Sequence, residues 1–158
     1  MKLRSLATVA ILFVSLVAPV VAQDALHSTT VAPADEYFGH SQMSILGIGN
    51  HIHDADAAIA AGNDPAPIFA GTLQNVTDAI HDWQQHFPND PWIASDLLAL
   101  EKVYLHVDTE YARRLARDTL AWLERDYGMS DSTMEAETAY ADASAPRNDR
   151  VSDNSAQR

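Results

Sequence analysis

Histidines paired with aspartates are the residues of this sequence best placed for chemistry, because imidazole binds metal ions and titrates near neutral pH. The chain has seven histidines. On a helix, two ligands face one ion when they are three or four residues apart. Four pairs have this spacing: His51–Asp54, His53–Asp56, His81–Asp78 and His86–Asp82. One hypothesis is therefore a helical metal-binding or metal-buffering site on His51, Asp54, His81 and His86 that takes zinc, copper or nickel.

Other patterns argue against dedicated metal or catalytic chemistry. Glu-x-x-His and His-Glu-x-x-His motifs are absent, and no two histidines are three or four residues apart. The sequence also lacks Gly-x-Ser-x-Gly, a glycine-rich phosphate loop and Ser-x-x-Lys. With no cysteine, thiol catalysis, disulfides, iron–sulfur clusters and covalent haem attachment are excluded. The leading prediction is a non-catalytic protein without a cofactor.

Aromatic residues are the second candidate set. Trp83 falls on an apolar helical stripe, so we expect it in the core. Trp92 lies at a corner between two expected helices, and Trp122 falls one position off the stripe of its helix. Each of these two side chains is as compatible with packing against the core as with anchoring a protein interface. In the leading hypothesis, a groove for a partner protein or peptide lies near Trp92, Tyr104 and Trp122.

Charge and the first residues bear on partners and location. The formal net charge of −12 argues against nucleic acid and anionic membrane surfaces, and favours basic partners. Residues 1–22 have the features of a signal peptide, with Lys2 and Arg4 before an apolar run that is too short for a comfortable membrane span. No later segment looks able to cross a membrane. These features predict export to the periplasm or the extracellular space.

The remaining sequence predicts an all-α fold, a small antiparallel bundle of about four helices. Apolar residues recur every three or four positions, as in Leu73, Val76, Ile80, Trp83 and Phe87. The expected helices span residues 35–61, 67–87 and 91–107, and a fourth follows Asp108 and Thr109 and ends at Tyr127. Gly62 is expected to end the first helix, and Asp90 with Pro91 to begin the third. Gly47 and Gly49 lie inside the first helix, where they favour close approach of a neighbouring helix.

The flanking segments differ in composition from the helical domain, which we place at residues 35–128. Residues 23–34 are polar, and we expect a flexible lead. Residues 129–158 are rich in Ser, Thr, Ala, Asp and Glu and almost free of large apolar residues. Such a composition does not form an apolar stripe, so it predicts a disordered acidic tail.

A weak internal repeat accompanies the helical pattern. A shift of 40 residues aligns Val76, Ile80, Trp83, Phe87 and Pro88 with Ala116, Leu120, Leu123, Tyr127 and Gly128. Each copy is a helix that ends in an aromatic residue and a helix breaker. From Phe69 to Ser130 the chain resembles tetratricopeptide-like units of bacterial envelope proteins, although Glu101 stands where that family usually has a small residue. The resemblance implies a helix-pair scaffold that binds another envelope protein or a peptide.

Overall fold

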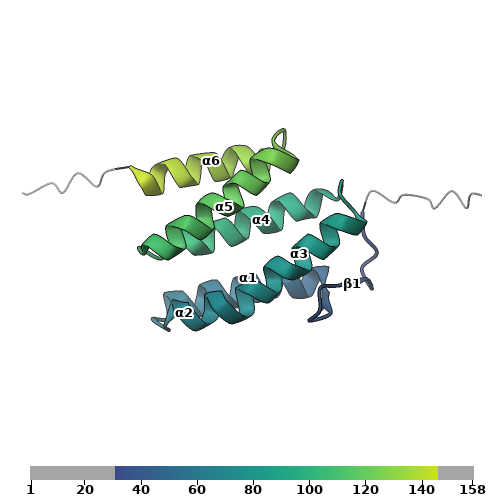
Figure 1. Ribbon diagram of the computed structural model, residues 1–158, viewed down its shortest axis with the longest axis horizontal. Coiled ribbons are helices and arrows are strands. Elements are labelled where there is room, and N and C mark those ends of the chain that lie inside the picture. Colours follow the sequence, from purple (N-terminus) through teal and green to yellow (C-terminus); the bar gives the residue numbers. More distant parts are fainter. Residues whose placement is uncertain (1–30, 146–158) are drawn as a thin grey trace, which may run out of the picture.

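The computed structural model describes residues 31–145, and these form an all-α fold with one short β-hairpin (Figure 1). The helices are α1 (Ile45–Ala60), α2 (Pro65–Ile68), α3 (Gln74–His86), α4 (Pro91–Leu105), α5 (Glu110–Tyr127) and α6 (Asp131–Ser144), and a π-helical segment, η1 (Phe69–Leu73), joins α2 to α3. The predicted fold class is confirmed. The expected signal peptide (1–22) and most of the expected lead (23–34) lie outside the described residues.

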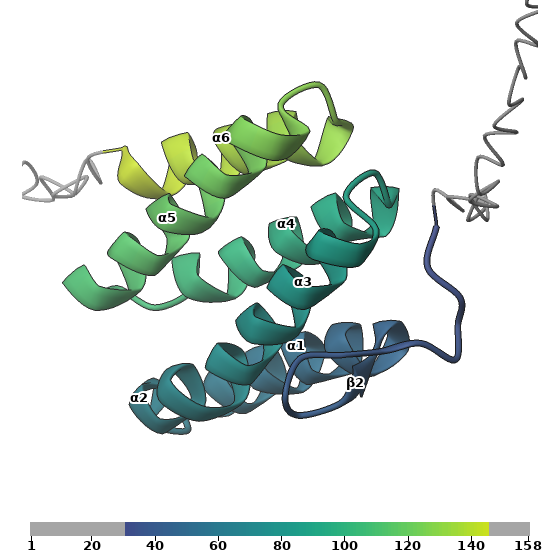
Figure 2. The ribbon, with the colours of Figure 1, turned by 45° about the vertical axis from the view of Figure 1, so that its right-hand side comes forward.

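The helices follow one another through space in nearly the order of the chain (Figures 1 and 2). Helix α1 lies beside α3 and α4 at one end of the molecule, and α4 packs in turn against α5 and α6 at the other end. A continuous apolar core runs between them, with Trp83, Leu97 and Leu123 fully buried. Within residues 31–145, no helix combines the length and the apolar character that a membrane span requires.

Side-chain caps fix where the helices begin. Asp64 accepts a hydrogen bond from the Ala66 N–H at 3.0 Å, and Asp90 accepts one from the Trp92 N–H at 3.1 Å. These carboxylates satisfy N–H groups that have no partner within the helix. Helix α1 ends just before Gly62. This residue has a φ of +88°, which glycine adopts without steric cost. The predicted beginning of α4 and end of α1 are therefore confirmed.

The predicted beginning of the first helix at residue 35 is wrong. Tyr37–Phe38 (β1) pairs antiparallel with Met43–Ser44 (β2), and α1 begins only at Ile45. The hairpin turn contains Gly39 with a φ of +67°, and the Ser44 hydroxyl caps α1 by accepting from the Gly47 N–H at 3.1 Å. A residue with a left-handed backbone conformation, such as Gly39, interrupts a right-handed helix. A helix that begins at Asp35 therefore cannot continue through the hairpin into α1.

The prediction of disorder from residue 129 is wrong for residues 131–144, which form α6. Ser130 caps this helix, and Thr133 and Ala136 are buried against the rest of the fold. The Thr133 hydroxyl donates to the Tyr127 carbonyl at 2.8 Å, which ties α6 to the end of α5. Small side chains let α6 approach α4 and α5 closely without a large apolar stripe. Residues 146–158 of the expected tail lie outside the described residues.

A hollow between α1 and α4

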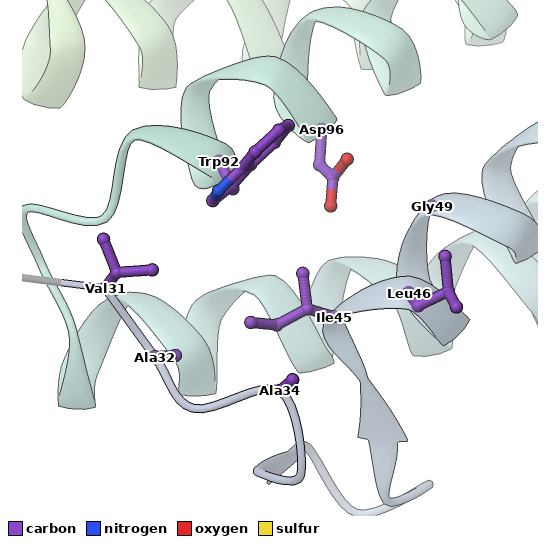
Figure 3. A pocket seen from close by; sticks show the side chains of 8 residues that line it. All are labelled: Val31, Ala32, Ala34, Ile45, Leu46, Gly49, Trp92 and Asp96. Carbon is purple, nitrogen blue, oxygen red and sulfur yellow. The ribbon is translucent and has the colours of Figure 1, made fainter.

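A half-open hollow of about 480 Å³ lies between the beginnings of α1 and α4 and the extended segment before the hairpin (Figure 3). Its size falls within the range of small-ligand and side-chain binding pockets. Helix α4 contributes Trp92 and Asp96. The remaining lining residues are apolar or glycine: Val31, Ala32, Ala34, Ile45, Leu46 and Gly49.

The extended segment is held in place by the buried carboxylate of Asp90. Asp90 is fully buried, and its Oδ2 accepts from the Ala32 N–H at 2.8 Å and from the Trp83 indole N–H at 3.1 Å. Its Oδ1 caps α4. The Asp90 side chain thus links three elements. These are the extended segment that forms a wall of the hollow, the buried side of α3 and the beginning of α4.

The hairpin that follows this segment is fastened to α3 by two further carboxylates. Asp82 accepts from the Gly39 N–H at 2.7 Å, and Asp78 accepts from the His40 N–H at 3.0 Å. The His40 imidazole also lies 2.6 Å from Asp78, and these contacts with His40 lower the pKa of Asp78. A Cβ atom on residue 39 would come within 2.9 Å of the Ala79 Cα, so glycine allows this close approach.

Asp96 is the titratable group among the described residues that line the hollow. Its carboxyl group points toward the open space (Figure 3), and burial among apolar side chains, followed by the negative charge of Asp90, raises its pKa to about 7. None of the described residues supplies a hydrogen bond or a positive charge that would lower the pKa of Asp96 again. Gly49 also lines this space, and a Cβ there would make an ordinary van der Waals contact with Asp96 Oδ1 at 3.8 Å.

The rim of the hollow is rich in exposed apolar surface. Trp92 is 58% exposed, Leu46 is 74% exposed and Val31 is 44% exposed. Single exposed apolar residues are common, but three around one concave site mark a surface that a ligand or partner can cover. The arrangement can therefore bury an apolar group while Asp96 contacts a polar or charged one.

The structure separates the three aromatic residues predicted to share a groove. Trp92 lies at the hollow. Tyr104 is 4% exposed and packs edge-on against Phe69, with the ring centroids 5.2 Å apart. Trp122 is 6% exposed, and its ring stacks on His81 at 3.9 Å. Tyr104 and Trp122 are therefore packing residues of the described fold.

The residues of the metal hypothesis are also dispersed. His51 and Asp54 are exposed on α1. His81 stacks on Trp122, and burial, followed by the charge of Arg125, lowers its pKa. His86 Nδ1 lies 2.8 Å from the backbone carbonyl of Asp82. Within residues 31–145, no three His, Asp, Glu or Cys side chains gather as ligands of one ion.

The sequence pattern indicated Trp92 but none of the other residues that line the hollow, Asp96 among them. Asp96 is one of many acidic residues in the chain, and its partial burial depends on the contact of α1 with α4. The available signal was its position four residues after Trp92, which places both on one side of α4. Comparisons with protein-family models, curated proteins and solved structures found no match to this chain.

Proposed function

We propose that this protein is an exported, non-catalytic binding module whose hollow between α1 and α4 takes up a peptide segment of a partner protein. The observation that carries the proposal is the half-open apolar hollow with exposed Trp92 at its rim and one carboxyl group inside. Export is supported by the signal-like composition of residues 1–22.

The chemistry of the hollow favours binding over catalysis. Of the eight described residues that line it, Asp96 alone carries a titratable side chain. General acid–base and nucleophilic mechanisms combine at least two positioned groups. An apolar surface around one polar group is instead typical of a pocket that orients a ligand.

A peptide selection tests this function. A phage-displayed library of random peptides is selected on the full-length protein, and an enriched peptide is synthesised for measurement by fluorescence anisotropy. We expect Trp92→Ala to weaken peptide binding by roughly tenfold or more, since a rim tryptophan that closes over a ligand acts as an interface hot spot.

The matched control is Met129→Ala. Met129 is 98% exposed and is absent from the lining of the hollow, so its truncation removes a comparable exposed apolar side chain elsewhere. It should leave peptide affinity unchanged. Failure to enrich any peptide, or equal affinity of every enriched peptide for the parent and Trp92→Ala proteins, would refute the proposed function.

A further inference from the structure

We propose that the group recognised in this hollow is an arginine side chain of the partner protein, with its guanidinium between the Asp96 carboxylate and the Trp92 ring. This inference rests on the proposed function and specifies its ligand. Both residues project from the first turns of α4, four positions apart, and Figure 3 shows the ring and the carboxyl group beside the same open space.

The state of Asp96 calls for a positively charged ligand. A carboxylate among apolar side chains loses hydration, and no described residue compensates it with a hydrogen bond or a cation. A cationic ligand would provide both. The chain as a whole has a formal net charge of −12, so its electrostatic field also attracts a basic partner.

The surroundings of Asp96 favour arginine over lysine. A guanidinium group is planar and more weakly hydrated than an ammonium group, so it enters an apolar site at lower cost. It can donate two parallel hydrogen bonds to one carboxylate and can stack on an indole ring. The apolar walls formed by Ile45, Val31 and Ala34 suit the aliphatic stem of the side chain.

The size and openness of the hollow favour a side chain on a larger molecule. A volume of about 480 Å³ exceeds one arginine side chain and leaves space for an apolar neighbour. Leu46 and Val31 line the hollow at its exposed rim, where a peptide backbone and its other side chains can cover them.

Probes with short alkyl chains of similar length test this assignment on the full-length protein. We would titrate n-butylguanidinium, n-butylammonium and 1-pentanol separately and follow the Trp92 indole N–H signal by NMR. At a pH of about 8.5, where Asp96 is ionised, we expect n-butylguanidinium to bind roughly tenfold more tightly than 1-pentanol. The n-butylammonium affinity should lie between the two.

Two changes should remove the preference for the cation. Asp96→Asn removes the charge with little change in shape, so n-butylguanidinium and 1-pentanol should then bind with similar affinity. Lowering the pH to about 5.5 protonates Asp96 and should have the same effect, because the guanidinium remains charged throughout. Asp90 is the charged group that acts on Asp96 from the beginning of α4, and the other described lining residues carry no charge.

The outcomes separate this inference from the proposed function. If 1-pentanol binds as tightly as n-butylguanidinium, or if n-butylammonium binds at least as tightly, the arginine assignment is wrong while the hollow remains a binding site. A preference for the cation that survives Asp96→Asn also overturns the assignment. If no probe shifts the Trp92 signal and the peptide selection also fails, both proposals fail.

Discussion

Asp90 shows how one residue can determine the shape of a site that it does not line. Its carboxylate accepts hydrogen bonds from the Ala32 N–H, the Trp83 indole and the Trp92 N–H, on three separate segments. Asp64 is a second aspartate at a helix beginning before a proline, but it is exposed and accepts one bond, from Ala66. Both residues cap the beginning of a helix, but Asp90 also binds two other segments of the chain.

We expect Asp90→Ala to lower the free energy of unfolding by about 2–4 kcal/mol, because it leaves buried N–H donors without acceptors. Asp64→Ala should cost about 1 kcal/mol, the usual effect of losing an exposed helix cap. Urea unfolding of both variants measures the difference. Equal losses would show that Asp90 acts as a helix cap alone.

Glu101 is a buried acid of α4. Its side chain is fully buried, and among the described residues neither of its carboxyl oxygens has a hydrogen-bond partner. Burial raises its pKa to about 7, and the neighbouring Lys102 opposes this effect. The ionised form is therefore costly in the folded state.

Replacement of Glu101 by methionine should stabilise the protein by about 1–3 kcal/mol at a pH of about 8, because it removes an uncompensated buried charge at similar volume. Glu124→Met, at an exposed position of α5, is the matched control and should have little effect. Chemical denaturation at that pH provides the measurement. A destabilised Glu101→Met protein would mean that the carboxylate has a stabilising partner.

At the scale of elements, α6 depends on close packing of small residues. Ala136 is fully buried, whereas Ala141 on the same helix is exposed. Ala136→Glu introduces a charge into this contact, so we expect α6 to detach and stability to fall by about 2–4 kcal/mol. Ala141→Glu should leave stability nearly unchanged. Amide hydrogen exchange along α6 would reveal the detachment, and similar protection in the two variants would contradict it.

The elements with strong local signals were predictable from sequence. Asp90 with Pro91 and the apolar stripe through Trp83 identified α3 and α4 because caps and periodicity are local. The hairpin and α6 were not predictable in this way. Gly39 lies in a turn because Asp78 and Asp82 of α3, about 40 residues later in the sequence, accept hydrogen bonds from the backbone of that turn. Helix α6 folds because α4 and α5 provide a surface that buries Thr133 and Ala136.

The same limit applies to the site. Trp92 was a candidate because it stands at a helix corner, and the structure places it at the hollow. Tyr104 and Trp122 have equally suitable side chains but face the interior. Which aromatic residue is exposed depends on how the helices pack, and so does the burial of Asp96. Composition and spacing do not contain that information.

At the scale of the whole molecule, four carboxyl groups with shifted pKa values fall into two classes with opposite effects on stability. Burial raises the pKa of Asp96 and Glu101 to about 7. Hydrogen bonds lower the pKa of Asp78, and those from Arg125 lower that of Asp126 to about 2. The first class favours the folded state at acidic pH, and the second favours it above the ordinary pKa of aspartate.

We therefore expect stability to fall as the pH rises from about 4.5 to about 7, because in this range the folded protein holds protons on Asp96 and Glu101 that the unfolded chain releases. Below about 4, protonation of Asp78 and Asp126 should lower stability again. Growing repulsion among the many negative charges would also lower stability as the pH rises. The double variant Asp96→Asn, Glu101→Met distinguishes the causes, since it retains nearly all of that charge. Its thermal midpoint should vary much less between pH of about 5 and 7 than that of the parent protein, and an equal decline in both would assign the pH dependence to overall charge.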